Sequence, residues 1–342
     1  MIITDAWRPQ VNGVVRTLAT VSRELEAMGY VVAVVGPDQF RTLPCPTYPD
    51  IRLSLLPGRK LARLIKAFAP DALHISTEGP LGMAARSWAL KRGYKFTTAF
   101  HTRFAEYLYA RTRIPTGWSY AWMRYFHGAG SGMMVATESL RQELARRGFT
   151  NIRAWSRGVD LEQFQPEPRE QWDMPRPVFA YIGRVAIEKN IGAFLSLDLP
   201  GSKVVVGDGP SRAALQRRFP GVHFAGVRHG ASLAQAFAGA DVFVFPSLTD
   251  TFGLVMLESL ACGTPVAAFP VTGPKDVLTE GVGIGAVDED LRRAALQALE
   301  TGDRAACRAY AERFSWRACS EAFLANLVPI TGAVQVEAPT AG

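Results

Sequence analysis

The stretch that decides the fold runs from residue 247 to residue 265 and reads Ser247-Leu-Thr-Asp250-Thr-Phe-Gly253-Leu-Val-Met-Leu-Glu258-Ser-Leu-Ala-Cys-Gly263-Thr-Pro265. An apolar run precedes it at residues 241–246, and a second apolar run follows at residues 265–269. This pattern predicts a strand, a polar loop, a helix that ends at Gly263 and a second strand. Such a unit is the repeat of a parallel α/β sheet.

The same unit carries two carboxylates and a potential anion site. Asp250 lies in the loop before the helix, and Glu258 follows eight residues later, which we expect to be a little over two turns into the helix. The loop at residues 251–253 is expected to leave backbone N–H groups at a helix start, where an anion binds well. Ligands of open α/β sheets bind at this edge. The carboxylates suit sugar or ribose hydroxyls, and the N–H groups suit phosphates.

Each carboxylate taken alone has a plainer interpretation. Asp250 by itself is as well explained as a helix N-cap. Glu258 by itself could be a solvated helix residue, but its apolar neighbours Met256, Leu257 and Leu260 indicate a largely buried helix.

Length and composition restrict the class of protein. A chain of 342 residues can form two domains with full cores. It has no run of about 18 apolar residues that would span a membrane, and its first residues lack the blocks of a signal peptide. The four cysteines show no metal or redox spacing, so we expect reduced thiols in a cytoplasmic protein.

Charge is distributed unevenly. Residues 1–157 hold 22 Lys and Arg against 10 Asp and Glu, a formal charge of +12, whereas residues 158–342 carry −5. The basic half favours an anionic partner surface, either nucleic acid or anionic lipid. Solubility charge spread over a large surface explains the excess equally well.

Apolar runs and helical periodicity predict an alternation of strands and helices in both halves. Strands are expected at residues 2–4, 30–35, 71–75, 94–100, 132–137, 178–182, 203–206, 223–225, 241–246 and 265–269. Residues 38–58 are Pro-rich and are expected to be irregular. Residues 161–177 hold four prolines among charges and are typical of a linker.

Two segments of the first half have a composition that is typical of membrane-surface segments. Residues 59–68 place four cations opposite an apolar face, as in a helix that lies on a membrane surface. Residues 103–128 mix aromatic residues with arginines, which suits a lipid interface or single-stranded nucleic acid. Solvated helix faces and core aromatics of two packed helices are the simpler explanations.

Polar residues also follow other predicted strands. Asn12 and Gly13 form a turn before a helix, and His101 follows the strand at 94–100, where ligands bind. Arg184 and Lys189 lie five residues apart in a loop before a helix and could grip a diphosphate. Taken alone, Gly13 is more simply a turn glycine and His101 a structural hydrogen-bonding residue.

Together these residues resemble the retaining glycosyltransferases of family 4, which have the GT-B fold. The matching motifs run in order along nearly the whole chain: Asn12-Gly13-Val14, Gly79-Pro80-Leu81-Gly82, Phe100-His101-Thr102, Gly158-Val159-Asp160, Gly183-Arg184 with Glu188-Lys189, Gly207-Asp208-Gly209-Pro210, and Asp250 with Glu258. The strings at residues 4–15 and 249–253 look like a subgroup that glycosylates lipids or uses GDP-mannose.

The resemblance implies two Rossmann-like domains that face each other across a donor-binding cleft. Residues 1–162 would form an acceptor-binding domain, 163–177 a linker and 178–313 the nucleotide-sugar domain. Residues 314–328 would form a helix that returns to the N-terminal domain. The tail at 329–342 has no apolar period and is expected to be disordered.

The resemblance also implies roles for individual residues. Arg184 and Lys189 match the pair that binds the donor diphosphate, Glu258 the carboxylate that holds the ribose, and Asp250 and His101 the groups near the donor sugar. The remaining donor contacts would come from Gly13, Val227, Arg228, Phe252, Gly253 and Leu254. The candidates on the acceptor side are Asn12, Glu78 and Arg103. Asp250 stands where many members of this family have Glu, so the identity of the donor sugar stays open.

The implied reaction moves a hexose from a UDP- or GDP-sugar to a hydroxyl, with retention of configuration. No aspartate cluster suggests a metal, so Arg184 and Lys189 would stabilise the leaving phosphate, and the nucleotide sugar would be a co-substrate with no further cofactor. The basic N-terminal domain favours a lipid acceptor such as diacylglycerol or a lipid-linked glycan, with the enzyme peripheral at the cytoplasmic membrane face and no nucleic acid as partner.

Three alternatives stay open at this point. A soluble sugar or polysaccharide could be the acceptor. An epimerase or dehydrogenase is disfavoured because the glycine triplet and a Tyr-x-x-x-Lys pair are missing. A non-catalytic GT-B scaffold that binds nucleotide is disfavoured by the intact set of His101, Arg184, Lys189 and Glu258.

Overall fold

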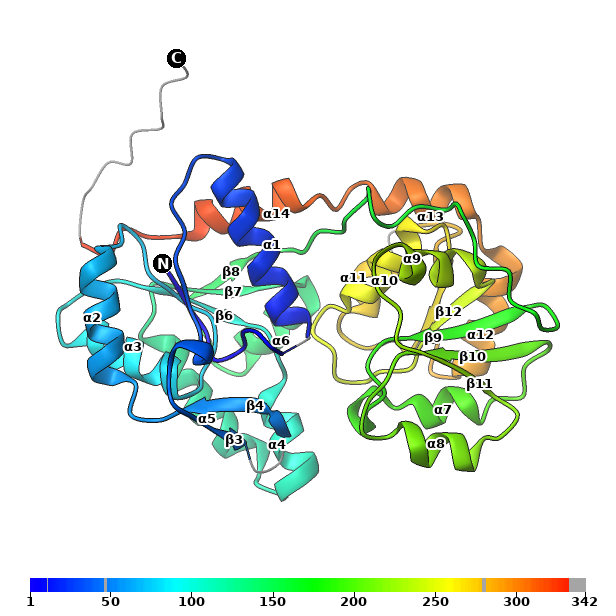
Figure 1. Cartoon of the computed structure of the whole chain (residues 1–342), viewed down its shortest axis with the longest axis horizontal. Coiled ribbons are helices and arrows are strands. Elements are labelled where there is room, and N and C mark those ends of the chain that lie inside the picture. The colour runs from blue at the N-terminus through cyan, green and yellow to red at the C-terminus, as the bar shows by residue number, and fades with distance from the viewer. Residues whose placement is uncertain (11, 46–47, 279–280, 332–342) are drawn as a thin grey trace, which may run out of the picture. The chain divides into compact units, whose positions relative to one another are not determined.

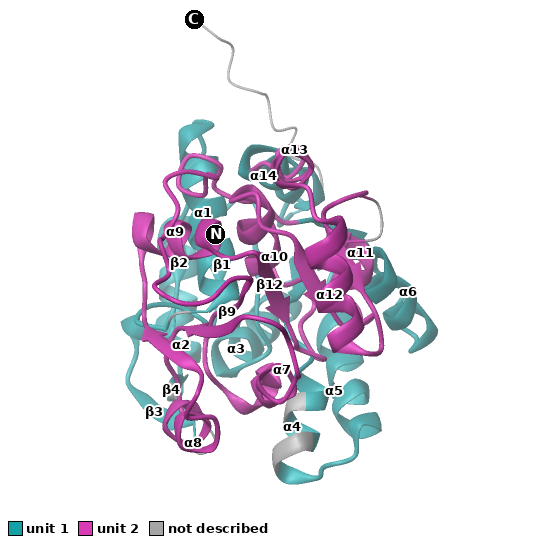
Figure 2. Cartoon of the chain, turned by 90° about the vertical axis from the view of Figure 1, so that its right-hand side faces the viewer, with its two compact units in different colours: residues 1–156, 316–342 teal, residues 157–315 magenta. Residues whose placement is uncertain are grey.

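The chain forms two compact α/β units (Figure 2). The structure, a computed structural model, describes residues 1–10, 12–45, 48–278 and 281–331. Unit 1 consists of Met1–Ser156 and the segment from Trp316 on, and unit 2 consists of Arg157–Ser315.

Unit 1 is built on a parallel sheet with the strand order β2-β1-β5-β6-β7-β8. Figure 1 labels β6, β7 and β8 of this sheet. Its strands are β1 (Ile2–Ile3), β2 (Val34–Val35), β5 (His74–Ile75), β6 (Thr97–Phe100), β7 (Gly132–Val135) and β8 (Ile152–Ala154). Its helices are α1 (Gly13–Ala27), α2 (Gly58–Phe68), α3 (Pro80–Leu90), α4 (Phe104–Thr112), α5 (Thr116–Gly128), α6 (Glu138–Arg146) and α14 (Trp316–Asn326).

Both faces of this sheet are covered, which explains the continuous apolar runs of its strands. Successive strand residues point to opposite faces. Ile2 packs with α1 and α14, in a cluster that includes Leu18 and Phe323. Ile3 packs with α2 and α3, in a cluster that includes Leu61 and Leu81. The segment after residue 315 therefore supplies part of the core of unit 1.

Unit 2 repeats the architecture with the strand order β11-β10-β9-β12-β13-β14. Its strands are β9 (Val178–Ile182), β10 (Ser202–Val206), β11 (His223–Gly226), β12 (Val242–Phe245), β13 (Val266–Ala268) and β14 (Gly285–Val287). Its helices are α7 (Ile191–Leu195), α8 (Arg212–Arg218), α9 (Gly230–Gly239), α10 (Leu254–Ala261), α11 (Pro274–Leu278), α12 (Leu291–Thr301) and α13 (Arg304–Ala311).

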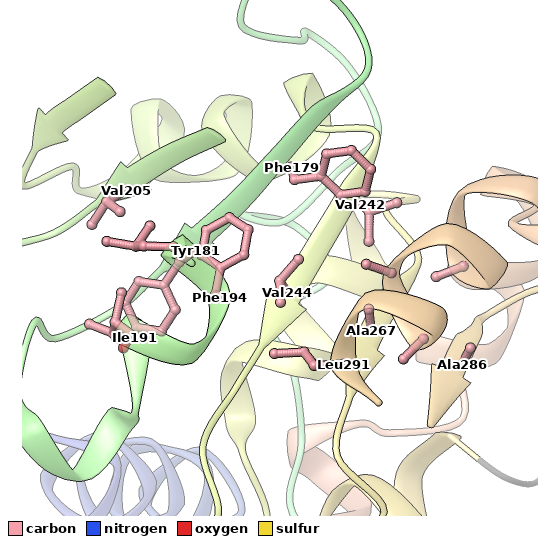
Figure 3. Close-up of a cluster of buried hydrophobic side chains, with 14 of the residues drawn as sticks. Phe179, Tyr181, Ile191, Phe194, Val205, Val242, Val244, Ala267, Ala286 and Leu291 are labelled. Atoms are coloured by element: carbon pink, nitrogen blue, oxygen red, sulfur yellow. The ribbon is translucent and has the colours of Figure 1, made fainter. Parts of the chain in front are cut away.

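One face of the second sheet packs against α7 and α12 (Figure 3). Phe179, Val205 and Val244 of the strands meet Phe194 of α7 and Leu291 of α12. The apolar strand runs at residues 178–182 and 241–246 thus form the centre of unit 2, as the sequence predicts.

The direction in which strands are added to the sheet of unit 2 reverses between β9 and β12, and we call the loop end of this point the crevice of unit 2. After β9 the chain adds β10 and β11 on one side and then returns to add β12 on the other side. The loops that leave β9 and β12 therefore diverge at their carboxyl ends, and ligands of such sheets bind there. The corresponding point in unit 1 lies between β1 and β5.

Several elements differ from the sequence prediction. Residues 38–58 are not irregular, because β3 (Thr42–Cys45) and β4 (Tyr48–Ser54) pair antiparallel. Strands β8 and β14 were not predicted, and β2 is confined to Val34–Val35. The short length of these edge segments gives them no clear apolar period.

The predicted linker and the predicted disordered tail also differ from the structure. The segment predicted as a linker belongs to unit 2, where Phe164 is buried and its carbonyl accepts from Arg308 Nη1 at 2.7 Å. Disorder from Pro329 on is wrong for the first residues, because Ile330 is buried in unit 1 and its N–H donates to the Asp71 carbonyl at 2.8 Å. The rest of that prediction, from residue 332, lies outside the described residues.

Within the described ranges of the chain, none of the helices has the length and apolar character that a membrane span requires.

Candidate active site

The loops that follow β9 and β12 bring a cation and a carboxylate together at the crevice of unit 2. The ammonium Nζ of Lys189 lies 2.6 and 2.9 Å from the two carboxylate oxygens of Asp250. Burial alone would raise the pKa of Asp250, but the Lys189 charge outweighs it and holds that pKa below its usual range. Asp250 is therefore an anion at neutral pH, paired with a cation from the neighbouring loop.

The backbones of the two loops are also joined. Asn190 ends a 3-10 turn at residues 187–189 with a positive φ of 53°, and its Nδ2 donates to the Pro246 carbonyl at 3.1 Å. Asn is among the few residues that adopt this conformation readily. The bond fixes the Lys189 loop against the Asp250 loop.

Arg184 lies in the same loop and has its own carboxylate partner. Its guanidinium forms an ion pair with Glu188, which is largely buried. The Tyr181 hydroxyl donates to the Arg184 carbonyl at 2.8 Å. Burial, and then the Asp250 charge, raise the pKa of Tyr181 well above its usual value, so it remains a neutral donor.

Helix α10 begins at Leu254 next to these groups. Gly253 is its N-cap residue, with a positive φ of 83° that favours glycine. Glu258 is therefore only four residues beyond the first helical residue, about one turn, rather than the two turns that the sequence predicts. Glu258 is buried, which agrees with the predicted buried helix, and Phe252 in the preceding loop is buried as well.

Glycines allow the backbones around the crevice to approach closely. A Cβ on Gly207, where φ is 138°, would lie 1.9 Å from the Gly183 carbonyl oxygen. The absence of a side chain at Gly207 lets the loop after β10 lie directly against the loop after β9, which carries Arg184.

Two further predicted donor residues, Val227 and Arg228, follow β11. Val227 is half exposed, whereas the Arg228 guanidinium donates to Glu170 at 3.1 Å. The Arg228 side chain is thus engaged in an ion pair within unit 2.

In unit 1 the predicted residues follow β1, β5 and β6. Asn12 caps α1, because its Oδ1 accepts from the N–H groups of Val14 and Val15 at 3.0 Å each. Gly13 is the first residue of that helix. His101 Nε2 lies 2.8 Å from the Ser76 hydroxyl.

The two other acceptor-side candidates are held by partners in unit 1. Glu78 Oε1 lies 3.0 Å from Nε2 of the buried His127. Arg103 forms a two-pronged ion pair with Glu143, at 3.1 and 2.6 Å. Burial opposes the charge of Arg103, but the Glu143 carboxylate prevails and raises the pKa of the guanidinium. Arg103 thus fastens α4 to α6.

Comparison with known proteins gives the family. Sequence profiles match residues 11–163 as Glycosyltransferase Family 4 and residues 176–301 as glycosyl transferases group 1. A GDP-mannose-dependent alpha-mannosyltransferase of Mycolicibacterium smegmatis is 30% identical over 305 residues, which are 81% of each chain. This chain is a family 4 glycosyltransferase.

Two other similar proteins extend the comparison. An alpha-monoglucosyldiacylglycerol synthase of Streptococcus pneumoniae is 25% identical over 344 residues, 87% of this glycosyltransferase and 77% of that protein. Anabaena HepE, solved with UDP and glucose, superposes with a TM-score of 0.67 at 15% identity over 95% of this chain and 98% of that one. The structural match confirms the predicted GT-B fold.

Asp5 and His127 of the glycosyltransferase were not predicted as site residues from the sequence. Asp5 follows β1, is buried, and accepts hydrogen bonds from the backbone of α3 and from the Thr77 hydroxyl. Its position directly after a buried strand is the signal that could have identified it. His127 lies inside an aromatic helix, where the sequence gives no such signal.

No cluster of three or more side chains suited to hold a metal ion occurs in the part of the glycosyltransferase that the structure describes.

Proposed function

We propose that this glycosyltransferase is a retaining enzyme that moves a hexose from a UDP- or GDP-sugar to a hydroxyl of a membrane lipid, such as diacylglycerol or a lipid-linked glycan. The observation that carries the proposal is the set of charged side chains at the crevice of unit 2. Arg184 and Lys189 are cations beside the helix start at Leu254, and Asp250 and Glu258 are the carboxylates.

The donor diphosphate binds Arg184 and Lys189 in this proposal. The N–H groups at Phe252, Gly253 and Leu254 add contacts because the first N–H groups of a helix have no partner within the helix. Glu258 accepts the ribose hydroxyls, and the backbone at Val227 and Arg228 meets the base. Gly13 contributes a further phosphate contact from unit 1.

The chemistry follows from where charge develops. The bond between the anomeric carbon and the phosphate oxygen breaks, and its electron pair leaves with the nucleoside diphosphate. Arg184 and Lys189 stabilise that negative charge, so no cofactor beyond the co-substrate is required. The acceptor hydroxyl attacks on the same face and its proton passes to the departing phosphate oxygen. His101 and Asp250 contact the donor sugar.

The acceptor is bound by unit 1 in this proposal. The name of one relative, an alpha-monoglucosyldiacylglycerol synthase, supports a glycolipid product. Asn12, Glu78 and Arg103 are the acceptor-side candidates. Arg103 donates two hydrogen bonds to Glu143, so we infer that it mainly supports α4. Glu78 contacts His127 through one carboxylate oxygen, and a carboxylate can accept several hydrogen bonds, so Glu78 is the better candidate for an acceptor hydroxyl.

Two exposed surfaces of unit 1 support association with an anionic membrane. The exposed face of α2 carries Arg59, Lys60, Arg63 and Lys66, directly after the almost fully exposed Leu56. On α5, Trp118 is 77% exposed and Tyr125 is 60% exposed. Residues 107–137 contain no acidic residue. Cations and interfacial aromatics together favour anionic lipid headgroups, so we place the enzyme at the cytoplasmic membrane face with no nucleic acid as partner.

The test is nucleoside diphosphate release from a panel of UDP- and GDP-sugars, with and without diacylglycerol in anionic liposomes. We expect release that requires both one donor and the lipid. Release that lipid does not stimulate would move the acceptor to a soluble sugar. No release from any donor, under any of these conditions, would contradict the proposal.

A further inference from the structure

The contact between Lys189 and Asp250 has a consequence for the diphosphate. Both carboxylate oxygens lie within hydrogen-bond distance of the ammonium, at 2.6 and 2.9 Å. The two side chains are 22% and 18% exposed, so water screens the pair only partly. The cation assigned to the diphosphate is thus paired with a carboxylate of the neighbouring loop.

The pair is built into the loops. Asn190 Nδ2 donates to the Pro246 carbonyl at 3.1 Å, and Thr249 Oγ1 donates to the Glu188 carbonyl at 3.5 Å. Glu188 and Asn190 flank Lys189 on one loop, and their bonding partners precede Asp250 on the other. The other cation, Arg184, forms an ion pair with Glu188.

A diphosphate that approaches Lys189 must share the ammonium with this carboxylate, which also repels it as a like charge. A carboxylate oxygen can accept more than one hydrogen bond. A sugar hydroxyl that donates to Asp250 therefore weakens the ion pair between Asp250 and Lys189, and the ammonium can then bind the phosphates.

We propose that Asp250 is an internal counter-ion of Lys189 that lowers the affinity for a nucleoside diphosphate without a sugar. In this role Asp250 is a positioning residue, which favours the intact donor and speeds release of the product. The inference rests on the proposed function, in which Lys189 binds the diphosphate.

The test uses Asp250→Asn, which keeps the size of the side chain and removes its charge. The dissociation constants of UDP and GDP are measured by titration calorimetry, beside turnover with the accepted donor. We expect the nucleoside diphosphate to bind about threefold tighter or more, as loss of a partly exposed ion pair predicts, while kcat falls. Asp250→Glu should keep the wild-type affinity within about twofold.

Two other results would overturn the inference. Unchanged diphosphate affinity in Asp250→Asn would mean that the carboxylate serves the donor sugar alone. Weaker affinity, with an unaltered melting temperature, would mean that it only holds Lys189 in place. Glu312→Gln removes another carboxylate of unit 2, one that pairs with Arg308 at 2.9 Å, and should leave the affinity unchanged.

A Lys189→Met background separates this inference from the proposed function. If Lys189→Met weakens diphosphate binding and the tightening by Asp250→Asn is lost in that background, the inference is supported. If Lys189→Met weakens binding but Asp250→Asn tightens it equally with and without Lys189, the inference alone is wrong. If Lys189→Met leaves the affinity unchanged, the proposed role of Lys189 is wrong and the inference falls with it.

Discussion

The carboxylate of Asp5 accepts a hydrogen bond from the backbone N–H of Leu81 at 2.9 Å, although the two residues are 76 positions apart. A second bond, from the Gly82 N–H at 3.2 Å, completes a cap on the start of α3. Gly79 permits this approach, because a Cβ there would lie 2.5 Å from the Asp5 carboxyl carbon. Asp5 thereby fixes the segment that carries Glu78.

Asp5 should make the stability of unit 1 depend on pH. Burial raises its pKa from 3.8 to about 6, against the effect of the backbone hydrogen bonds. Because the folded-state pKa is the higher one, the stabilisation that Asp5 provides is complete below about pH 4 and is lost as pH rises through about 6. As the pH rises from 5 to 7, the free energy of unfolding of Asp5→Asn should therefore increase by about 1 kcal/mol relative to that of wild type, measured by urea unfolding. Parallel pH curves for the two proteins would contradict this role.

Gly207 should tolerate no side chain. A Cβ added at Gly207 would lie 1.9 Å from the Gly183 carbonyl oxygen, so Gly207→Ala must displace the loop that carries Arg184. We expect a loss of about 2 kcal/mol or more in stability and weaker nucleotide binding, measured by thermal melting and calorimetry. Gly221→Ala is the matched control, because a Cβ there meets nothing within 4 Å. Equal melting temperatures for the two variants would refute the argument.

The last helix should be essential to unit 1. Phe323 of α14 is fully buried, with its ring 5.0 Å from the Trp155 ring. Phe323→Ala should cost about 3–5 kcal/mol in the free energy of unfolding. The exposed Glu321→Ala on the same helix should cost less than about 0.5 kcal/mol. A small effect of Phe323→Ala, measured by chemical denaturation, would show that α14 does not hold the core.

The sequence predicted the centres of both sheets because strands such as 178–182 and 241–246 are buried on both faces and read as apolar runs. It did not predict the hairpin of β3 and β4, where prolines and exposed side chains obscure the alternation. Site residues could be predicted only where the local sequence identifies them. Arg184, Lys189 and Asp250 belong to recognisable loops, whereas the role of Asp5 depends on a contact with residues 76 and 77 positions away.

Trp118 and Tyr125 should contribute more to membrane binding than to the fold. Both rings are mostly exposed, and the Arg86 guanidinium lies 4.0 Å from the centroid of the Tyr125 ring, so replacing both with Ser should lower the melting temperature by less than about 5 °C. We expect the fraction that sediments with anionic liposomes at low salt to fall several-fold. Val282→Ser, at an exposed apolar residue of unit 2, is the control. Undiminished sedimentation of the double variant would exclude the α5 surface from membrane contact.

Lys189 should be needed for turnover. Lys189→Met removes a cation that would stabilise the leaving diphosphate, so kcat should fall about 10²- to 10³-fold. The Asp250 carboxylate also loses its partner, and we expect a modest loss of stability, about 1 kcal/mol, by thermal melting. Near-normal turnover in this variant would contradict the assignment of the site.

The measurement that tests the central claim most directly is the anomeric configuration of the lipid product, determined by proton NMR after reaction with the accepted α-linked donor. We predict an α-glycoside that forms with wild-type enzyme and is absent with Lys189→Met. A β-glycoside would contradict the retaining mechanism, and a product that forms equally well without Lys189 would contradict the site.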